Sequence, residues 1–321
     1  MNVWLLLAVN SISYGGLLFL LSAGFSLIFG LMRIPNLMHG SFFMLGAYLG
    51  TSILDKGVRL GGTIFAQGIS LFGTTIFEHG MTLPTLVLLA PKPNFFIAAL
   101  LSGLIMAVIG GLIERLLLRR LAGQELPQVL LTLGLSFIVA DLCLMIWTGD
   151  PVQPPTPEQL RGALQVAGLF FPIYRLAIVL VAVAVAIALW LLVDWTRLGA
   201  MIRAGVDDAP IARVVGIKVS RLFTLVFALG AALAAFGGVI GAPYLSVYPG
   251  LDAEMLPLAL IVVILGGTGS LHGTLIGSFL IGFLYNFGQA RFPDLAYVIL
   301  FLPMLLILVL RPQGLFGKVA P

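Results

Sequence analysis

The residues with side chains that could perform chemistry are few in this chain, and they do not combine into a catalytic pattern. No Ser/His/Asp set, no His-Glu-x-x-His motif and no Gly-Lys-Ser/Thr phosphate loop is visible in the sequence. The adjacent Glu78 and His79 are too few for a metal site, and the single cysteine, Cys143, cannot form a disulfide within the chain. We therefore expect no enzyme activity, no metal and no cofactor.

A second group of polar residues interrupts long apolar runs. Asn10 and Tyr14 lie in the first run, and Asp141 lies in a later one, where an acid is a functional hypothesis by default. Asn36 and His39 follow a proline between two apolar runs, which is typical of a broken or re-entrant helix. These five residues are candidates for a transport path. The alternatives are interhelical hydrogen bonds for Asn10 and Tyr14, a turn capped by Asn36, and an interface or neighbour contact for Asp141.

Glycines form a third pattern, GGTGSLHG at residues 266–273, between two apolar runs. We predict either a break between two half-helices, whose freed backbone groups face a cavity or a partner subunit, or a sharp turn between helices. Gly266, Gly267 and Gly269 are therefore also candidates for the path.

Composition identifies the solvent of these elements as lipid. The chain has 321 residues, of which 60% are hydrophobic and 9% charged, whereas soluble domains carry about 25% charged residues. We predict one transmembrane domain over residues 1–321, an all-α polytopic bundle of eight or nine spans with broken or re-entrant helices. The first span is expected to stay rather than to be removed as a signal peptide. Residues 55–94 and 148–172 are predicted extracytoplasmic loops, the first with an interfacial or partly inserted piece.

The distribution of Lys and Arg gives an orientation. Residues 114–125 and 196–221 hold three and five of them, and the tail 311–321 holds two. The loop 242–254 carries Asp252 and Glu254 but no Lys or Arg. Because cytoplasmic loops are enriched in basic residues, we predict a cytoplasmic C-terminus and an N-terminus outside.

The basic island at residues 196–221 is predicted to meet a soluble partner. Asp207 and Asp208 precede a Pro at position 210, which is a good helix start, and Gly216 suits a helix end. We therefore expect a short cytoplasmic helix from about Pro210 to Val215. The alternative is an ordinary amphipathic loop that follows the positive-inside rule.

Four stretches, in order, resemble the permease subunits of branched-chain amino acid ABC transporters. They are GLMRIPNLMHGSFFMLGAY, LGAMIRAGVDDAPIARVVGIKVSRLFTLVFALGAALAAFGGVIGA, VILGGTGSLHGTLIGSFLIG and LRPQGLFG. The resemblance implies an importer in the bacterial inner membrane, with a second homologous permease, two ATPase subunits and a periplasmic solute-binding protein. It also implies that residues 204–216 dock on an ATPase. The residues assigned to this coupling are Arg203, Ala204, Asp207, Asp208, Ala209, Ala212, Arg213 and Gly216.

Two departures leave the solute open between a branched-chain amino acid, an amide, urea and another small polar solute. The family usually has Asn-Phe-Ala-His-Gly where this chain has NLMHG at residues 36–40, and the segment 55–94 is longer than usual. The alternative function is a stand-alone ion-coupled carrier or channel, in which Asp141 would couple ion and solute.

Overall fold

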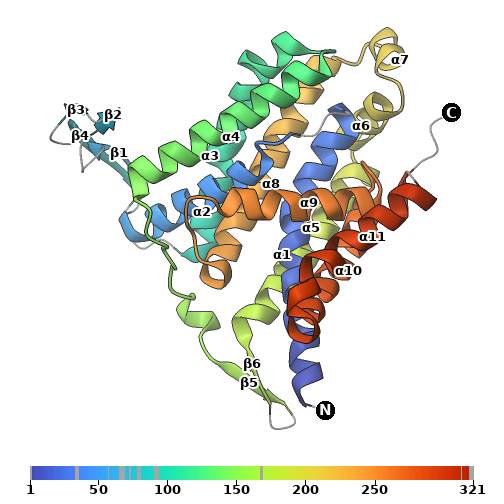
Figure 1. The fold of residues 1–321 in the computed structure, drawn as a ribbon. Coiled ribbons are helices and arrows are strands. Elements are labelled where there is room, and N and C mark those ends of the chain that lie inside the picture. The colour runs from blue at the N-terminus through green and yellow to red at the C-terminus, as the bar shows by residue number, and fades with distance from the viewer. Residues whose placement is uncertain are drawn as a thin grey trace.

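The fold is described from a computed structural model of the chain. The structure describes residues 2–32, 36–56, 58–64, 69–71, 74–77, 81–89, 94–166, 169–311 and 313–317. The helices are α1 (Asn2–Met32), α2 (His39–Lys56), α3 (Phe95–Leu116), α4 (Glu125–Trp147), α5 (Ile173–Trp195), α6 (Arg197–Asp207), α7 (Ala209–Val214), α8 (Val219–Leu245), α9 (Leu251–Gly266), α10 (Leu271–Arg291) and α11 (Ala296–Leu310). Three short 3₁₀ turns follow α3, precede β5 and precede α11: η1 (Leu118–Leu121), η2 (Glu158–Leu160) and η3 (Pro293–Leu295). The fold is thus dominated by helices, as the composition predicted (Figure 1).

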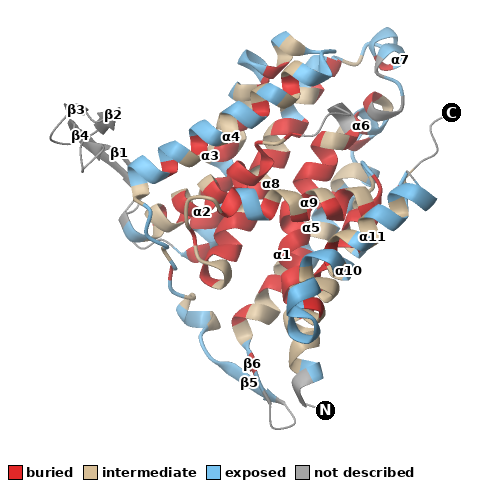
Figure 2. Cartoon of the chain, viewed as in Figure 1, coloured by how far each residue is buried: buried red, intermediate tan, exposed pale blue. Residues whose placement is uncertain are grey.

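The bundle is built around α1. This helix is apolar on all sides, so it is stable only where other helices cover it completely. It packs against α5, α8, α9 and α10, and α8 in turn packs against α2 and α3. Figure 2 shows the buried residues concentrated along α1, α2, α8 and α9 at the centre of the molecule.

Close helix contacts at the centre depend on small residues. A side chain at Gly24 of α1 would place its Cβ 2.6 Å from the carbonyl oxygen of Gly230 in α8. Such contacts let two helix backbones approach closely, which is how helices associate where lipid provides no hydrophobic drive between them.

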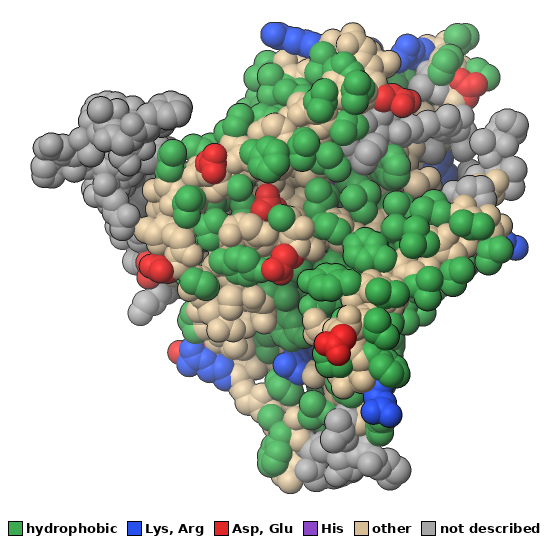
Figure 3. Space-filling view, viewed as in Figure 1, with side chains coloured by type: hydrophobic (Ala, Val, Ile, Leu, Met, Phe, Trp, Pro, Cys, Tyr) green, Lys and Arg blue, Asp and Glu red, His purple; other side chains and the backbone are tan. Residues whose placement is uncertain are grey.

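The outer helices present apolar faces to lipid. Along α3, large side chains spaced four residues apart are 50–65% exposed, namely Leu100, Leu104, Val108, Leu112 and Leu116. The opposite face of α3 buries small residues such as Ala99 and Gly103. The space-filling view shows hydrophobic side chains over most of the visible face (Figure 3), so the molecule is a membrane protein.

Six helices within the described residues are long and apolar enough to cross a membrane. They are Trp4–Gly30, Phe95–Leu121, Glu125–Trp147, Ile173–Trp195, Val219–Leu245 and Pro293–Leu310. The expected eight or nine spans are therefore not confirmed. The difference lies in α2, α9 and α10: α9 is too short, with 16 residues, while α2 and α10, with 18 and 21, are long enough but not apolar enough.

The loops contain strands that the all-α prediction did not include. In the predicted loop 55–94, β1 (Val58–Ile64) pairs antiparallel with β4 (Met81–Leu89), and β2 (Ile69–Leu71) pairs with β3 (Thr74–Phe77). In the predicted loop 148–172, β5 (Ala163–Val166) pairs with β6 (Leu169–Pro172). The short apolar run that suggested a partly inserted piece is mostly β4, since a run too short to span as a helix can satisfy its backbone in a hairpin.

We predict that Gly24→Leu destabilises the bundle, because the added side chain would overlap the backbone of Gly230. Overpacking of this kind costs about 1–3 kcal/mol or more, and it should lower the midpoint of thermal unfolding in detergent. Gly134→Leu is the matched control, since nothing lies within 4 Å of a Cβ at Gly134. Equal midpoints for the two variants would contradict the close α1–α8 contact.

Candidate functional site

The turn from α5 into α6 fixes the direction of the basic island. The Thr196 hydroxyl caps α6 by accepting a hydrogen bond from the Gly199 amide at 3.1 Å. A Cβ at Gly199 would lie 2.0 Å from the Val193 carbonyl oxygen, so only glycine fits this turn. Arg203 donates to the same carbonyl and forms an ion pair with Asp194 at 3.4 Å. Arg203 therefore ties α6 to the end of α5, which is a structural contact within the chain.

The short helix predicted near residues 210–215 is α7, and its ends have the expected chemistry. The Asp208 carboxylate accepts a hydrogen bond from the Ile211 amide at 2.9 Å, and Pro210 lies in the first turn. After the helix, Gly216 has φ +90°, which is the left-handed conformation that ends helices. The sequence prediction of this helix is confirmed to within one residue at each end.

One face of α7 is apolar and exposed, a feature that the sequence analysis missed. Ile211, Val214 and Val215 are 61%, 89% and 74% exposed, and we call these three residues the apolar tip. Ala212, between them, is 2% exposed and faces the molecule. The signal was present in the sequence, because positions 211, 214 and 215 are spaced i, i+3 and i+4 and so share one helix face.

The remaining predicted coupling residues differ in burial. Ala212 is buried and Ala204 is half-buried, so both pack within the protein beneath the apolar tip. Arg213 is exposed beside the tip. The side chains of Asp207 and Ala209 lie outside the described residues.

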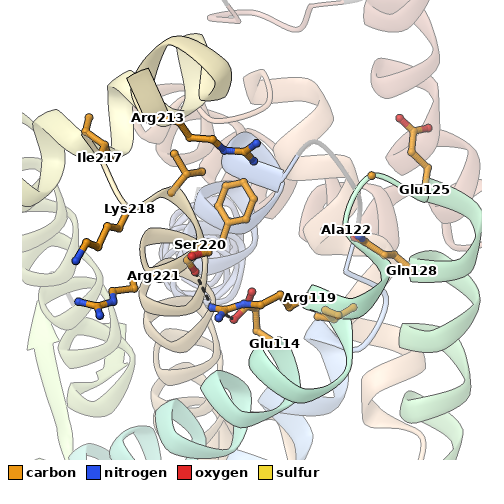
Figure 4. Close-up of a pocket in the computed structure, with 14 residues that line it drawn as sticks. Glu114, Arg119, Ala122, Glu125, Gln128, Arg213, Ile217, Lys218, Ser220 and Arg221 are labelled. Atoms are coloured by element: carbon orange, nitrogen blue, oxygen red, sulfur yellow. Dashed lines mark hydrogen bonds and ion pairs between the residues drawn. The ribbon is translucent and has the colours of Figure 1, made fainter. Parts of the chain in front are cut away.

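A cavity of about 550 Å³ lies beside the island, between η1 and the start of α8 (Figure 4). At its base the carboxylate of Glu114 is 2% exposed and accepts a hydrogen bond from the Thr224 hydroxyl at 2.5 Å. Arg119 lies 3.5 Å from the same carboxylate and donates to the carbonyl oxygen of Ser220 at 2.8 Å. These bonds join the end of α3 to the first turns of α8.

Two of the predicted path residues meet in an aromatic cluster at the opposite end of the bundle. The Tyr14 ring stacks on Tyr285, with centroids 4.7 Å apart. Arg175 donates to the Asn10 amide oxygen and lies 5.2 Å from the centroid of Tyr244. A cation over an aromatic face is attracted by the ring, so this cluster holds one positive charge among four polar side chains.

Asn36 and His39 lie at the start of α2. The Asn36 side-chain oxygen accepts a hydrogen bond from the Met38 amide at 3.2 Å, so the capped turn that was the alternative is present. His39 is fully buried, and its Nε2 lies 3.0 Å from the Leu21 carbonyl oxygen. Within the described residues the Asn36 amide nitrogen and the His39 Nδ1 have no partner. Both groups are thus buried with unused hydrogen-bonding capacity.

The structure adds a buried carboxylate that the sequence placed in a loop. Asp252 lies in the first turn of α9, is 8% exposed, and accepts a hydrogen bond from the Ser41 hydroxyl at 2.8 Å. Gly40 packs against the Asp252 backbone, where a Cβ would lie 2.6 Å from its carbonyl oxygen. The N-termini of α2 and α9 therefore meet, and a negative charge between two helix N-termini is favourable.

The glycines predicted to break a helix form the turn between α9 and α10; they are Gly266, Gly267 and Gly269. The carbonyl oxygens at the end of α9 accept hydrogen bonds from the C-terminal tail. The amide of Leu315 donates to Leu265 at 2.9 Å, and that of Phe316 donates to Gly266 at 3.1 Å. The sharp-turn alternative is the one that the structure has.

Asp141 joins neither polar group. It is exposed on α4 and forms no ion pair with another described residue. An exposed acid on this outer helix is compatible with the interface contact that was its alternative.

The chain is thus a helical membrane protein with a short helix, α7, exposed at one end of the bundle. The chain belongs to the family described as branched-chain amino acid transport system / permease component, whose model matches residues 7–308. The predictions of this family and of a helical membrane fold are confirmed. The family is one of permeases and not of enzymes.

Curated relatives match almost the whole chain. BraD of Pseudomonas aeruginosa, a high-affinity branched-chain amino acid transport system permease protein, is 26% identical over 97% of this chain and 94% of its own length. LivH of Escherichia coli, with the same description, is 23% identical over 96% and 94%. The ribose import permease RbsC of Escherichia coli is 26% identical over 73% of each chain. No solved structure matches.

We predict that Ser41→Ala lowers the free energy of unfolding by about 1.5–3 kcal/mol, because it leaves the Asp252 carboxylate without its hydrogen-bond donor. Ser136→Ala is the control, since the exposed Ser136 hydroxyl bonds only to its own helix. Denaturant unfolding in detergent measures both. A loss for Ser41→Ala no larger than for the control would show that the contact between α2 and α9 contributes little.

Proposed function

We propose that this chain is the permease subunit of an ABC importer for branched-chain amino acids or closely related small amino acids or amides. Separate ATPase subunits supply the energy, a second permease completes the path, and a periplasmic binding protein delivers the solute. The solute class rests on the names of BraD and LivH. The match to RbsC indicates that the scaffold is compatible with other polar solutes as well.

The observation that carries this proposal is the apolar tip on α7. Ile211 and Val214 project from α7, whose inner face is buried at Ala212, and the exposed Val215 follows as the residue that caps the helix end. An exposed apolar patch beside charged residues is typical of a protein contact site. Lipid is a poor partner for the tip, because Asp208 and Arg213 flank it and are exposed. We assign the tip to a groove on an ATPase subunit.

The charge distribution supports a cytoplasmic position for this end of the bundle. Nine described basic residues lie at the helix ends near α6, α7 and the tail: Arg115, Arg119, Arg120, Arg197, Arg203, Arg213, Lys218, Arg221 and Arg311. Arg161, Arg175 and Arg291 lie at the other end, and Lys56 and Arg59 lie in the segment 55–94 that was predicted to be extracytoplasmic. The positive-inside rule then directs α7 and the C-terminus to the cytoplasm.

The contacts of α6 suggest how a movement of the ATPases reaches the spans. α6 contacts α1, α5 and α8, and α7 contacts α6 and α8. Arg203 and the tight turn at Gly199 make α6 follow the end of α5. A force on the apolar tip therefore acts on α5, α8 and the central α1 together. We propose that this rocks the helices around a path that includes Asn10, Tyr14, Asn36 and His39.

We predict that Val214→Asp combined with Val215→Asp abolishes co-purification of the ATPase subunits and ATP-driven uptake. Two buried carboxylates in an apolar contact cost several kcal/mol unless they find partners. Uptake and co-purification are measured in membranes that hold the whole importer. Val214→Ile is the matched control and should retain both, because it keeps an aliphatic side chain at the tip.

The alternative of a stand-alone carrier makes the opposite prediction. If the purified chain alone moves solute in liposomes, and the Val214→Asp/Val215→Asp variant does so equally well, the proposal that separate ATPase subunits drive transport is wrong. Asp141→Asn should leave ATP-driven uptake unchanged.

A further inference from the structure

Arg175 directs its charge into the bundle, at the end of the molecule that carries the N-terminus (Figure 1). It lies in the first turn of α5, donates to the Asn10 amide oxygen on α1, and lies 5.2 Å from the ring centroid of Tyr244 on α8. An arginine at the end of a membrane helix usually extends its charge toward headgroups and water. Anchoring α5 in the bilayer therefore does not explain the direction that Arg175 takes.

This inward charge has no counter-ion among the described residues. Neither Arg175 nor Glu254 forms an ion pair there. Asn10 offers Arg175 one neutral oxygen, whereas a guanidinium presents five N–H donors in a planar fork that matches the two oxygens of a carboxylate. A carboxylate would bind Arg175 more strongly than the Asn10 amide does, because hydrogen bonds between charged groups are stronger than bonds to neutral ones.

Glu254 supplies the opposite charge to the same cluster. It is exposed in the first turn of α9, and it lies close enough to Tyr14 and Tyr248 for its charge to act on their hydroxyl groups. The ring centroid of Tyr14 lies 6.4 Å from that of Tyr244, beside which Arg175 lies. Tyrosine rings, whose faces attract cations, thus separate one unpaired positive charge from one unpaired negative charge.

The cluster lies in line with the other residues proposed for the path. Leu21 follows Tyr14 by seven positions on α1, which is about 10 Å along a helix. The Leu21 carbonyl oxygen contacts the buried His39, at the start of α2. A solute that passes the tyrosines along α1 therefore next meets the start of α2.

We propose that Arg175 and Glu254 recognise the two charged groups of a free α-amino acid. The solute carboxylate binds Arg175, and the solute ammonium binds Glu254 and the faces of the tyrosines. This recognition site rests on the proposed function, because it selects among the solutes that the importer could carry. An amide or urea brings no carboxylate and cannot form the charged pair with Arg175, so the site favours amino acids over amides.

The experiment is saturation-transfer NMR of the full chain in phosphatidylcholine nanodiscs, with three probes of one carbon skeleton. L-leucine carries both charges, 4-methylpentanoate carries only the carboxylate, and 4-methylpentanamide carries neither. We expect leucine to bind most tightly, and the acid to bind about tenfold more tightly than the amide, since hydrogen bonds to charged groups contribute more than neutral ones.

Arg175→Gln should weaken the binding of leucine and of 4-methylpentanoate about tenfold, and it should bring the acid and the amide to equal affinity. Arg161→Gln is the matched control and should bind as the wild type does. It removes a charge from the same end of the bundle, but Arg161 is exposed and donates to the backbone of Thr156.

Glu254→Gln tests the other half of the site. It should weaken the binding of leucine and leave that of 4-methylpentanoate unchanged, because only leucine carries an ammonium group. Since Glu254 is exposed, this variant tests the site even if Arg175→Gln fails to fold.

The recognition site is wrong if the wild type binds the acid and the amide equally or does not bind leucine. Equal losses in Arg175→Gln and Arg161→Gln would also overturn it. ATP-driven uptake of leucine is measured in parallel, in membranes that hold the whole importer. Uptake without the expected binding preference leaves the proposed function standing and removes the site. The expected preference without any ATP-driven uptake leaves the site standing and removes the proposed function.

Discussion

Inside a bilayer, a backbone amide or carbonyl that is freed from a helix has no water to bond, so the protein itself must supply its partner. This constraint explains the polar contacts at the centre of the molecule. Just before α2, the Asn36 side chain accepts a hydrogen bond from the backbone amide of Met38. Where α9 ends, the amides of Leu315 and Phe316 donate to its last carbonyl groups. The end of α9 is therefore satisfied by a segment that lies far away in the sequence.

The two ends of the bundle differ in how their polar and apolar side chains are arranged. The end with the N-terminus holds Asn10, Tyr14 and Arg175 in one aromatic cluster, which closes the space between α1, α5 and α10. The end with α7 holds its charged residues in tight turns and leaves aliphatic side chains free. In the function proposed above, solute enters at the end with the polar cluster and the ATPase subunits act at the end with α7.

The sequence predicted best the features that depend on local chemistry. Pro210 and Gly216 mark α7 because a proline and a left-handed glycine have few uses other than helix ends. The family also followed from sequence alone, because four motifs occur in the right order. The 55–94 hairpins were missed, because their strands have neighbours only within the loop and their run of apolar residues resembles a partly inserted helix.

Features that depend on distant partners could not be predicted. Nothing near Asp252 in the sequence reveals that Ser41, 211 positions earlier, donates to it. The eight or nine predicted spans are not confirmed, and the helices in question, α2 and α9, meet each other at Gly40 and Asp252, which lie far apart in the sequence. The exposure of Val214 and Val215 was missed for another reason: their spacing from Ile211 puts the three on one helix face, but it does not say whether that face is covered.

The bond between the tail and α9 has a consequence for biosynthesis. The amides of Leu315 and Phe316 donate to Leu265 and Gly266, each 50 positions earlier in the chain. While the chain is being synthesised, the carbonyl groups at the end of α9 are made before these amides exist. The turn between α9 and α10 is thus completed only once the segment around Leu315 has been made and has folded back onto it.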